Sequence, residues 1–301
     1  MIDNPRSPRV RAVAKLAKRD ARSATGLFLL EGPQAVAEAL TFRPELVVEL
    51  YGTPTALERY TDIGQAAVDA GVDVEFVTEH VLDSMADTVT PQGIVAVCHQ
   101  FPTSVKDLLH PKLDGSAPAL IAILEEVRDP GNAGTIIRAA DAAGADGVIL
   151  TGRSVDLYNP KVVRASTGSI FHLPIAVGVE LGSVLEKARA AGVQILAADL
   201  RGDDLLAARG DGLLAAPTAW LFGNEARGLS DEQLALADRV ITVPIYGHAE
   251  SMNLATAASV CLYESAFAQS TGSEHQARAP GKRLSRLGHN LCAGLTPDTR
   301  V

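Results

Sequence analysis

The sequence has few cysteines, and those it has lie far apart. Cys98, Cys261 and Cys292 lack the close spacing that zinc and iron–sulfur sites require, so we expect no metal centre. An odd number of scattered thiols is typical of proteins in a reducing compartment, where disulfides do not persist. We therefore expect a cytoplasmic protein whose cysteines are buried and unreactive.

The sequence also lacks any apolar run long enough to span a membrane. A membrane helix needs about 20 consecutive apolar residues, and no segment approaches this length. The first residues are polar and basic with no apolar stretch behind them, so they do not resemble a signal peptide. We expect a protein that does not act at a membrane.

A third missing feature is the glycine motif of dinucleotide-binding enzymes. A dehydrogenase of that class carries Gly-x-Gly-x-x-Gly directly after the first strand of its cofactor domain. The segment Gly131-Asn132-Ala133-Gly134 does not have this spacing. The usual open-sheet methyltransferases also place glycines after their first strand, so the chain is unlike either class.

What the sequence does have is a globular composition with an uneven distribution of charge. Apolar residues make up 47% and charged residues 21% of the 301 residues, which suits two folded domains. The net charge is −9, yet residues 1–22 hold seven basic side chains against two acidic ones, and residues 271–301 hold five against two. Basic ends suit contact with phosphates, although a solvated surface would carry the same charges.

The first hundred residues alternate between short apolar runs and helical segments, as in a small α/β domain. We place this domain at 23–101, after the basic segment at 1–22 and before a proline-rich linker at 102–118. The expected strands are 28–32, 45–51, 74–77 and 93–98, and the expected helices are 33–40 and 56–70.

The second half alternates between strand and helix more strongly. Its apolar runs are rich in β-branched residues, which is typical of a parallel sheet buried on both faces in a doubly wound α/β domain. This domain spans 119–269 and is followed by a tail at 270–301 that we expect to be disordered. The expected strands are 119–124, 147–151, 193–200, 219–222 and 239–245, and the expected helices are 132–143, 181–191, 230–237 and 254–268.

Polar residues follow the strands of the second half, where an open α/β sheet binds its ligands. Asn132 is placed to cap the helix after the first strand, and Arg138 lies six positions further along. Lys161 and Arg164 are three positions apart, so both can face one side of a helical turn. Each feature, taken alone, would also suit an ordinary surface helix.

Two further strand ends carry small and polar residues. One strand ends in Gly223-Asn224-Glu225. The strand at 239–245 is followed by a helix that we expect to start at about Ser251, with Asn253 in its first turn. Small residues at strand ends leave backbone donors and acceptors available for the edge of a purine. Alone, both segments are ordinary strand–helix connections.

The order of these segments is more specific than any one of them. NxGxxxRAA, KxxRASxG, FGNExxGL and VPIxGxxESMNLA follow one another between Leu120 and Gln269. Together they resemble the SpoU/TrmH family of RNA 2′-O-ribose methyltransferases. FLLEGPQAVAEAL and TPQGIVAV, in the first domain, resemble the ribosomal-protein-like RNA substrate-binding domain that is often fused to this family.

The resemblance implies a SPOUT-type parallel-sheet domain whose C-terminal chain forms a deep trefoil knot. It implies S-adenosylmethionine as the cofactor, in a pocket whose loops match Gly223, Val243 and Met252 here, with Leu200 as an addition. Met252 stands where the family usually has leucine, a change that preserves an apolar contact. The family also forms homodimers with the active site at the interface.

The resemblance further places Arg138 at the 2′-hydroxyl that receives the methyl group. An ordinary guanidinium has a pKa above about 12 and is a poor base. We therefore expect Arg138 to hold the target phosphate and to stabilise the developing alkoxide. The residues expected to order the site are Asn132, Glu225, Ser251 and Asn253, and those expected to bind RNA are Arg164, Lys161, Arg9 and Arg11.

Ribosomal RNA is the favoured substrate, because the family's tRNA enzymes more often lack the first domain. A tRNA 2′-O-methyltransferase is the alternative. A non-catalytic RNA-binding protein is a further one, since the basic start and the first domain could bind RNA by themselves. Such a protein would be expected to have lost motif residues, whereas Arg138, Glu225, Ser251 and Asn253 are all present.

Overall fold

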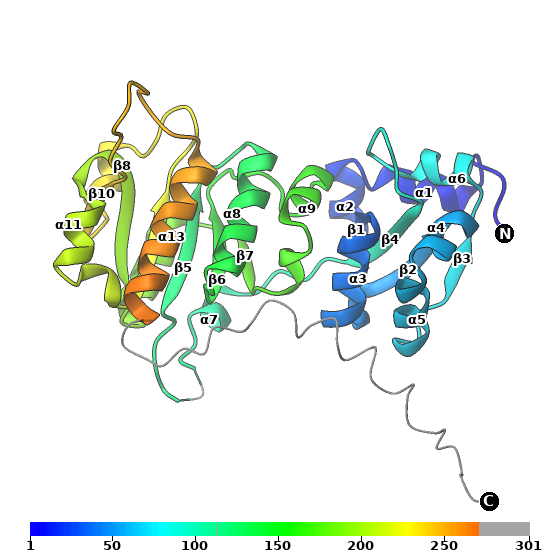
Figure 1. Ribbon diagram of the computed structural model, residues 1–301, viewed down its shortest axis with the longest axis horizontal. Coiled ribbons are helices and arrows are strands. Elements are labelled where there is room, and N and C mark those ends of the chain that lie inside the picture. The colour runs from blue at the N-terminus through cyan, green and yellow to red at the C-terminus, as the bar shows by residue number, and fades with distance from the viewer. Residues whose placement is uncertain (113, 271–301) are drawn as a thin grey trace, which may run out of the picture.

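The structure is a computed structural model that describes residues 1–112 and 114–270. The tail predicted to be disordered therefore lies outside the described residues, apart from Ser270. Two α/β domains lie side by side along the long axis of the molecule (Figure 1). No helix in the described ranges is long and apolar enough to cross a membrane.

The first domain is built on a four-stranded mixed sheet in the order β1-β4-β2-β3. The central strand β4 (Ile94–His99) pairs antiparallel with β1 (Leu27–Glu31) and β2 (Val47–Gly52), and β3 (Val74–Phe76) pairs parallel with β2. All four predicted strands are present. The helices between them are α3 (Pro33–Phe42), η1 (Pro44–Leu46), α4 (Pro54–Arg59), α5 (Thr61–Asp69) and α6 (Glu79–Met85).

The basic segment at the N-terminus folds against the first domain. It forms α1 (Pro8–Lys15), capped by the Ser7 hydroxyl, and α2 (Arg19–Thr25). The apolar side chains Val10 and Val13 of α1 are buried together with residues of α6, so this helix is fixed by its own hydrophobic contacts. Several of its basic side chains remain exposed on the outer side.

The second domain contains a six-stranded, wholly parallel sheet in the order β10-β8-β9-β5-β6-β7. β7 was not predicted: it is an edge strand interrupted by Gly178, whose φ of +69° lies in the left-handed region. The strands are β5 (Leu120–Glu125), β6 (Gly147–Thr151), β7 (Ile175–Val179), β8 (Gln194–Asp204), β9 (Thr218–Phe222) and β10 (Arg239–Thr242).

Helices cover both faces of this sheet, as the doubly wound pattern predicted. Alternate residues of β5 enter different cores: Ile121 and Ile123 face one, and Leu120, Ala122 and Leu124 the other. The first face is covered by α7 (Val105–Leu108), α10 (Leu181–Ala190) and α12 (Asp231–Ala235). The second is covered by α8 (Pro130–Ala142), α9 (Pro160–Ser166), α11 (Leu205–Gly210) and α13 (Leu254–Ser270).

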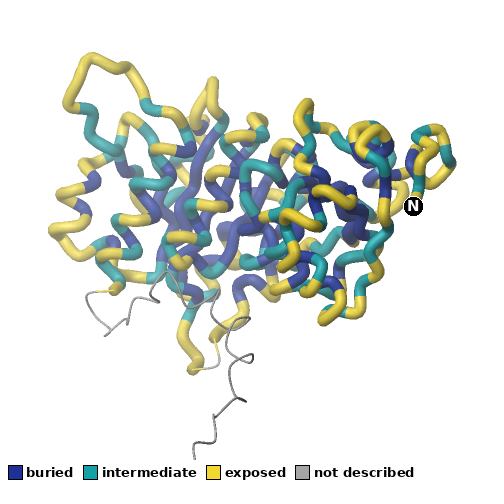
Figure 2. The backbone as a smooth tube through the Cα atoms, turned by 45° about the vertical axis from the view of Figure 1, so that its right-hand side comes forward, coloured by how far each residue is buried: buried dark blue, intermediate teal, exposed yellow. Residues whose placement is uncertain are grey.

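The two domains share a hydrophobic core, and buried strands run through both of them (Figure 2). At their junction the ring of Phe28 lies 4.8 Å from that of Tyr158, and Phe101 stacks on Phe171 at 5.6 Å, centroid to centroid. Aromatic pairs at this spacing add to the energy gained from burial. The first domain is therefore packed against the second, and the chain from 102 to 118 does not act as a free spacer.

Charged side chains reinforce the same junction. Arg22 is almost wholly buried, lies 2.5 Å from the carboxylate of Asp156, and also donates to two backbone carbonyls of its own domain. His172 lies between two carboxylates, Asp141 at 2.7 Å from Nδ1 and Glu38 of the first domain at 3.0 Å from Nε2. Breaking such pairs would leave charges without partners at a largely buried surface.

Candidate active site

Three loops at the carboxyl edge of the parallel sheet bring together residues that are far apart in sequence. The loops follow β5, β9 and β10 (Figure 1). Asn253 donates from Nδ2 to Oδ1 of Asn132 over 3.0 Å, and Nδ2 of Asn132 donates to Oε1 of Glu225 over 3.4 Å. The structure thus joins three of the five residues predicted to order or perform catalysis. We call these three the amide–carboxylate set.

Glu225 fixes the loop that precedes α8. Its carboxylate accepts from the backbone N–H of Asp129 at 2.9 Å and from that of Arg128 at 3.2 Å. Asp129 caps α8 by accepting from the N–H of Asn132, with Pro130 at the first helical position. The prediction that Asn132 caps this helix is therefore wrong. Asn132 lies inside the first turn, where its side chain reaches the other two loops.

Asn253 caps the last helix. Its Oδ1 accepts from the N–H groups of Ala255 and Thr256 at 2.9 and 3.2 Å, which would otherwise have no partner in the first turn. The helix begins at Leu254, which confirms the start of the predicted range 254–268 and not the alternative start near Ser251. Asn253 therefore precedes the first turn. Ser251 is exposed and makes no side-chain hydrogen bond to any other described residue.

Arg138 stands apart from the amide–carboxylate set within one chain. It is exposed on α8, and its Nη1 lies 3.4 Å from Oγ1 of Thr167 at the end of α9. Thr167 has a φ of +51°, the left-handed conformation that ends α9. Among the described residues, Arg138 has no hydrogen bond to Asn132, Glu225 or Asn253.

The four residues predicted to bind the cofactor lie on segments around β8, β9 and β10. Gly223 is buried, and a Cβ there would lie 2.5 Å from the carbonyl carbon of Gly228, so two parts of this loop approach too closely for a side chain. Val243 and Met252 are half-buried at either end of the loop between β10 and α13. Leu200 is 59% exposed. The described residues include no group of three side chains that could hold a metal ion.

Two of the four cations predicted to bind RNA are paired with carboxylates of the protein. Arg164 lies 3.0 Å from both Glu31 and Asp87 of the first domain, so it joins the two domains. Arg9 lies 2.8 Å from Glu75 and 3.4 Å from a second glutamate on the neighbouring strand.

The other two predicted cations are available. Lys161 and Arg11 are exposed, and neither forms an ion pair with another described residue.

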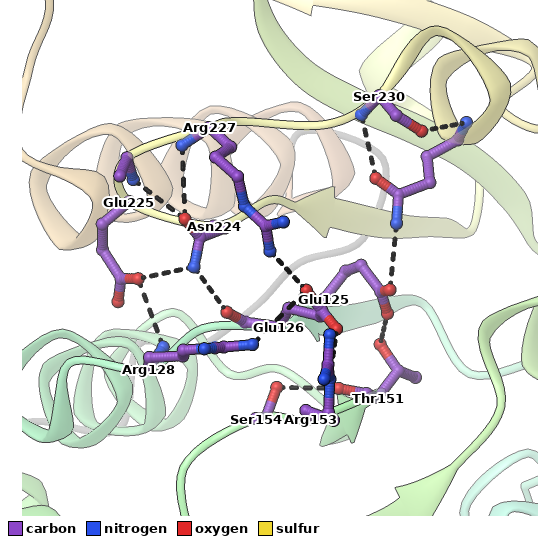
Figure 3. Close-up of polar contacts among 12 residues, drawn as sticks. Glu125, Glu126, Arg128, Thr151, Arg153, Ser154, Asn224, Glu225, Arg227 and Ser230 are labelled. Atoms are coloured by element: carbon purple, nitrogen blue, oxygen red, sulfur yellow. Dashed lines mark hydrogen bonds and ion pairs between the residues drawn. The ribbon is translucent and has the colours of Figure 1, made fainter.

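A polar cluster that the sequence did not single out lies beside the amide–carboxylate set (Figure 3). Glu125 ends β5 and is buried; it accepts from the Thr151 hydroxyl at 2.5 Å and from Nε2 of Gln233 at 3.0 Å. Burial raises the pKa of its carboxyl above the ordinary value. Glu126 follows, and its backbone carbonyl accepts from the side chain of Asn224 at 2.9 Å. The sequence feature that could have indicated this cluster is the pair Glu125-Glu126, which follows the apolar run 119–124 directly.

Both domains match known family models. Residues 119–263 match the SpoU rRNA methylase family, and residues 29–104 match the RNA 2′-O ribose methyltransferase substrate-binding domain. The chain is 32% identical over 262 residues to the 23S rRNA (guanosine(2553)-2′-O)-methyltransferase RlmP of Bacillus subtilis, a match that covers 87% of this chain and 97% of that protein. The chain belongs to the SpoU rRNA methylase family.

Solved structures of similar proteins have the same architecture. The AdoMet-bound rRNA methyltransferase from Sinorhizobium meliloti matches with a TM-score of 0.75 at 33% identity, over 88% of this chain and 96% of that one. The SpoU methyltransferase AviRb from Streptomyces viridochromogenes, in complex with AdoMet, matches with a TM-score of 0.74 at 29% identity, over 88% and 100%. These matches confirm the predicted family and the predicted α/β SpoU-type fold.

Proposed function

We propose that this SpoU-family protein methylates the 2′-hydroxyl of a ribose in ribosomal RNA, with S-adenosylmethionine as the methyl donor. The observation that carries the proposal is the amide–carboxylate set, which three separate loops assemble at the carboxyl edge of the sheet. Relatives named as 23S rRNA 2′-O-methyltransferases align over both domains. That alignment favours ribosomal RNA over tRNA, and the assembled set favours catalysis over RNA binding alone.

The loops around the predicted cofactor residues suit a bound nucleoside. Val243 and Met252 offer half-buried apolar surface, Leu200 exposes its side chain, and Gly223 leaves backbone groups accessible where no side chain fits. We propose that these four residues hold S-adenosylmethionine, whose sulfonium supplies the methyl group.

Arg138 then acts on the RNA. Its guanidinium is a positively charged donor and a poor base, so it binds a phosphate and stabilises the negative charge that develops on the ribose oxygen. The amide–carboxylate set joins the N-termini of α8 and α13 and fixes the distance between them. Ser251 offers an exposed hydroxyl directly before the capped end of α13.

The proposal includes the knot expected for this fold. β10 lies at the edge of the sheet, yet α13, which follows it, packs at the centre against α8 and β5. The loop from 243 to 253 therefore crosses the carboxyl ends of β8 and β9. A Cβ on Gly202 of β8 would lie 2.5 Å from the backbone of β10. The path from the edge strand β10 to the central helix α13 is the observation that supports a threaded chain.

The proposal also includes a homodimer whose active site is shared. Arg138 is exposed and separate from the amide–carboxylate set of its own chain, which supports completion of the site by a second copy. Val260, Tyr263 and Phe267 recur at helical spacing on α13, and the last two are 37% and 48% exposed. An apolar, aromatic stripe of this kind is typical of a homodimer interface.

The cysteines support a cytoplasmic location, which is part of the same proposal. Cys98 and Cys261 are free and buried, and burial raises the pKa of both thiols. Reaction requires a thiolate, so both are unreactive, as predicted. Free thiols together with a ribosomal RNA substrate fit the reducing compartment in which ribosomes act.

Transfer of labelled methyl groups tests the activity. We expect the full-length protein to label unmodified 23S rRNA on a ribose oxygen, as mapped by mass spectrometry, and Arg138→Ala to abolish labelling without loss of S-adenosylmethionine binding by calorimetry. Arg209→Ala is the matched control, because Arg209 is an exposed arginine paired with Glu264 away from the site. Labelling of tRNA alone would contradict ribosomal RNA as the substrate. Absence of S-adenosylmethionine binding would contradict the proposed methyltransferase activity.

Subunit complementation tests the shared site. Arg138→Ala and Asn253→Ala should each be inactive, but a mixed dimer would contain one site without either substitution. Random mixing of equal amounts makes half of the dimers mixed, and each mixed dimer has one intact site out of two. About a quarter of the wild-type activity should therefore return in a twofold-symmetric dimer. If mixing restores none while the mixed dimers form, the active site is complete within one chain.

A further inference from the structure

Glu126 is unusual among the acidic residues of the described chain, because it pairs with three arginines. Its carboxylate lies 2.6 Å from Nη2 of Arg227, 3.3 Å from Nε of Arg153 and 3.9 Å from Nη2 of Arg128. These arginines come from the loops after β9, β6 and β5 (Figure 3). Every other arginine that forms an ion pair in residues 1–112 and 114–270 has at least one carboxylate that no other arginine shares. Arg9, Arg164 and Arg201 have two each.

The three arginines carry two more charges than the carboxylate of Glu126 neutralises, and their guanidinium groups are exposed. The adjoining carboxylates are bonded elsewhere, Glu125 to Thr151 and Gln233 and Glu225 to backbone N–H groups. The side chains of Arg128, Arg153 and Arg227 are 52%, 81% and 64% exposed, against 20% for Glu126. Each guanidinium has five N–H groups, and one carboxylate can accept from only a few of them. Most of these donors face solvent. Their planar geometry matches the oxygens of a phosphate group.

The backbone around Glu126 is held in an uncommon conformation. Glu126 has a φ of +51°, in the left-handed region that residues other than glycine rarely adopt. Its carbonyl accepts from Asn224 and its N–H donates to the carbonyl of Thr151 at 3.4 Å. Backbone strain that neighbouring contacts maintain is frequent at binding sites. Here it directs the carboxylate to the place where the three loops meet.

The cluster adjoins the amide–carboxylate set directly. The backbone N–H of Arg128 donates to Glu225, and the side chain of Asn224, one residue before Glu225, holds the carbonyl of Glu126. A cavity of about 190 Å³ opens here, and Arg227 is the one arginine of the three on its wall. The other lining residues are Glu125, Glu126, Asn224, Gly228, Ser230 and Gln233. An anion bound by the arginines would lie beside the predicted catalytic residues.

We infer that Arg128, Arg153 and Arg227 bind phosphates of the RNA backbone next to the methylated nucleotide. The inference rests on the proposed function and adds residues to it that the family resemblance did not supply. In the free protein, Glu126 reduces repulsion among the three guanidinium groups and keeps them together. In the complex, the RNA phosphates take the remaining N–H donors, which are more numerous than a single carboxylate can satisfy.

Salt-dependent RNA binding by full-length variants tests the inference. The probe is an unmodified 23S rRNA transcript, and its affinity is measured by filter binding over a series of KCl concentrations. The double variant Arg153→Ala/Arg227→Ala should bind several-fold more weakly. The slope of log affinity against log salt should fall by about 0.7–0.9 for each phosphate that the variant no longer neutralises. Arg153→Lys/Arg227→Lys keeps both charges and should retain most of the wild-type slope.

Arg209→Ala/Arg239→Ala is the matched control. The side chains of Arg209 and Arg239 are 44% and 52% exposed and each has its own carboxylate, so their removal should leave the salt slope unchanged. If the cluster only ties the three loops together, Arg153→Ala/Arg227→Ala will lower the thermal midpoint and leave the slope at its wild-type value, which overturns the inference. If the wild-type protein neither binds nor methylates RNA, the proposed function itself is wrong and the inference with it.

Discussion

Gly134 is a position where alanine should destabilise the protein although it is the better helix former. Gly134 lies in α8, and replacing a helical glycine by alanine normally stabilises a protein by about 1 kcal/mol. Here a new Cβ would stand 2.5 Å from the carbonyl oxygen of Val162 and 3.0 Å from the backbone nitrogen of Ser166. Ordinary contact begins near 3.4 Å, so α8 and α9 would have to separate by about 0.9 Å.

The two opposing effects can be compared. Forcing extra atoms into a packed interface costs typically about 1–3 kcal/mol, and these neighbours are backbone atoms that cannot rotate away. After subtraction of the helix preference, Gly134→Ala should lower the free energy of unfolding by up to about 2 kcal/mol. The separation would also displace Arg138 relative to Thr167, so we expect methyl transfer to fall as well.

Urea unfolding provides the measurement, with Gly64→Ala as the control. Gly64 lies inside α5, and a Cβ there would meet nothing within 4 Å. Its replacement should raise the free energy of unfolding by about 0.5–1 kcal/mol, since only helix preference changes. Both midpoints should shift at an unchanged denaturant slope. Stabilisation by Gly134→Ala would refute the argument from packing between α8 and α9.

Three further predictions concern charged groups. Arg138→Lys should keep most of the RNA affinity but slow methyl transfer, because an ammonium cannot make a two-point contact; near-normal turnover would contradict this role. Hydrogen bonds to Asp141 and Glu38 raise the pKa of His172 to about 9, so its stabilisation is complete below its ordinary pKa of 6.5 and is lost as pH rises through about 9. In His172→Gln the thermal midpoint should therefore fall less steeply between pH 6.5 and about 9 than in the wild type. A pH profile identical to that of the wild type would contradict this role of His172. Arg22→Ala should lower the free energy of unfolding by roughly 3 kcal/mol or more, since it leaves a carboxylate unpaired at the domain junction; a urea midpoint close to that of the wild type would disprove this.

The strands could be predicted from the sequence wherever apolar, β-branched residues run together. What could not be predicted depends on partners distant in the chain. β8 continues to Asp204 because Asp203 and Asp204 pair with Ile241 and Thr242 of β10, although the segment itself is polar. The helix predicted over 56–70 breaks at Tyr60, because Thr53 caps a first helix that ends there and a second begins at Thr61.

In the site too, residue types could be predicted from local sequence, whereas contacts between distant residues could not. Asn132, Glu225 and Asn253 could be named from the order of the motifs, but the hydrogen bonds that join them span 93 and 121 positions. The predicted RNA-binding role of Arg164 rests on local sequence, namely its spacing to Lys161 and the KxxRASxG motif. Its partner Glu31 lies 133 positions away, so no local pattern could show that its charge is already neutralised. Residue types at a site are thus readable from sequence, whereas their pairing requires the fold.

The pairing of charges decides how a protein with a net charge of −9 can bind RNA. Arg22, Arg164 and His172 are engaged with carboxylates at the domain junction, so they orient the first domain and contribute little charge to the surface. The remaining exposed cations, such as Arg11 and those around Glu126, have to supply the attraction to phosphates. A few localised contacts on an acidic body give weak binding to arbitrary RNA, because long-range repulsion opposes it. We therefore expect tight binding to require an RNA whose phosphates reach both domains, which the junction holds at a fixed separation.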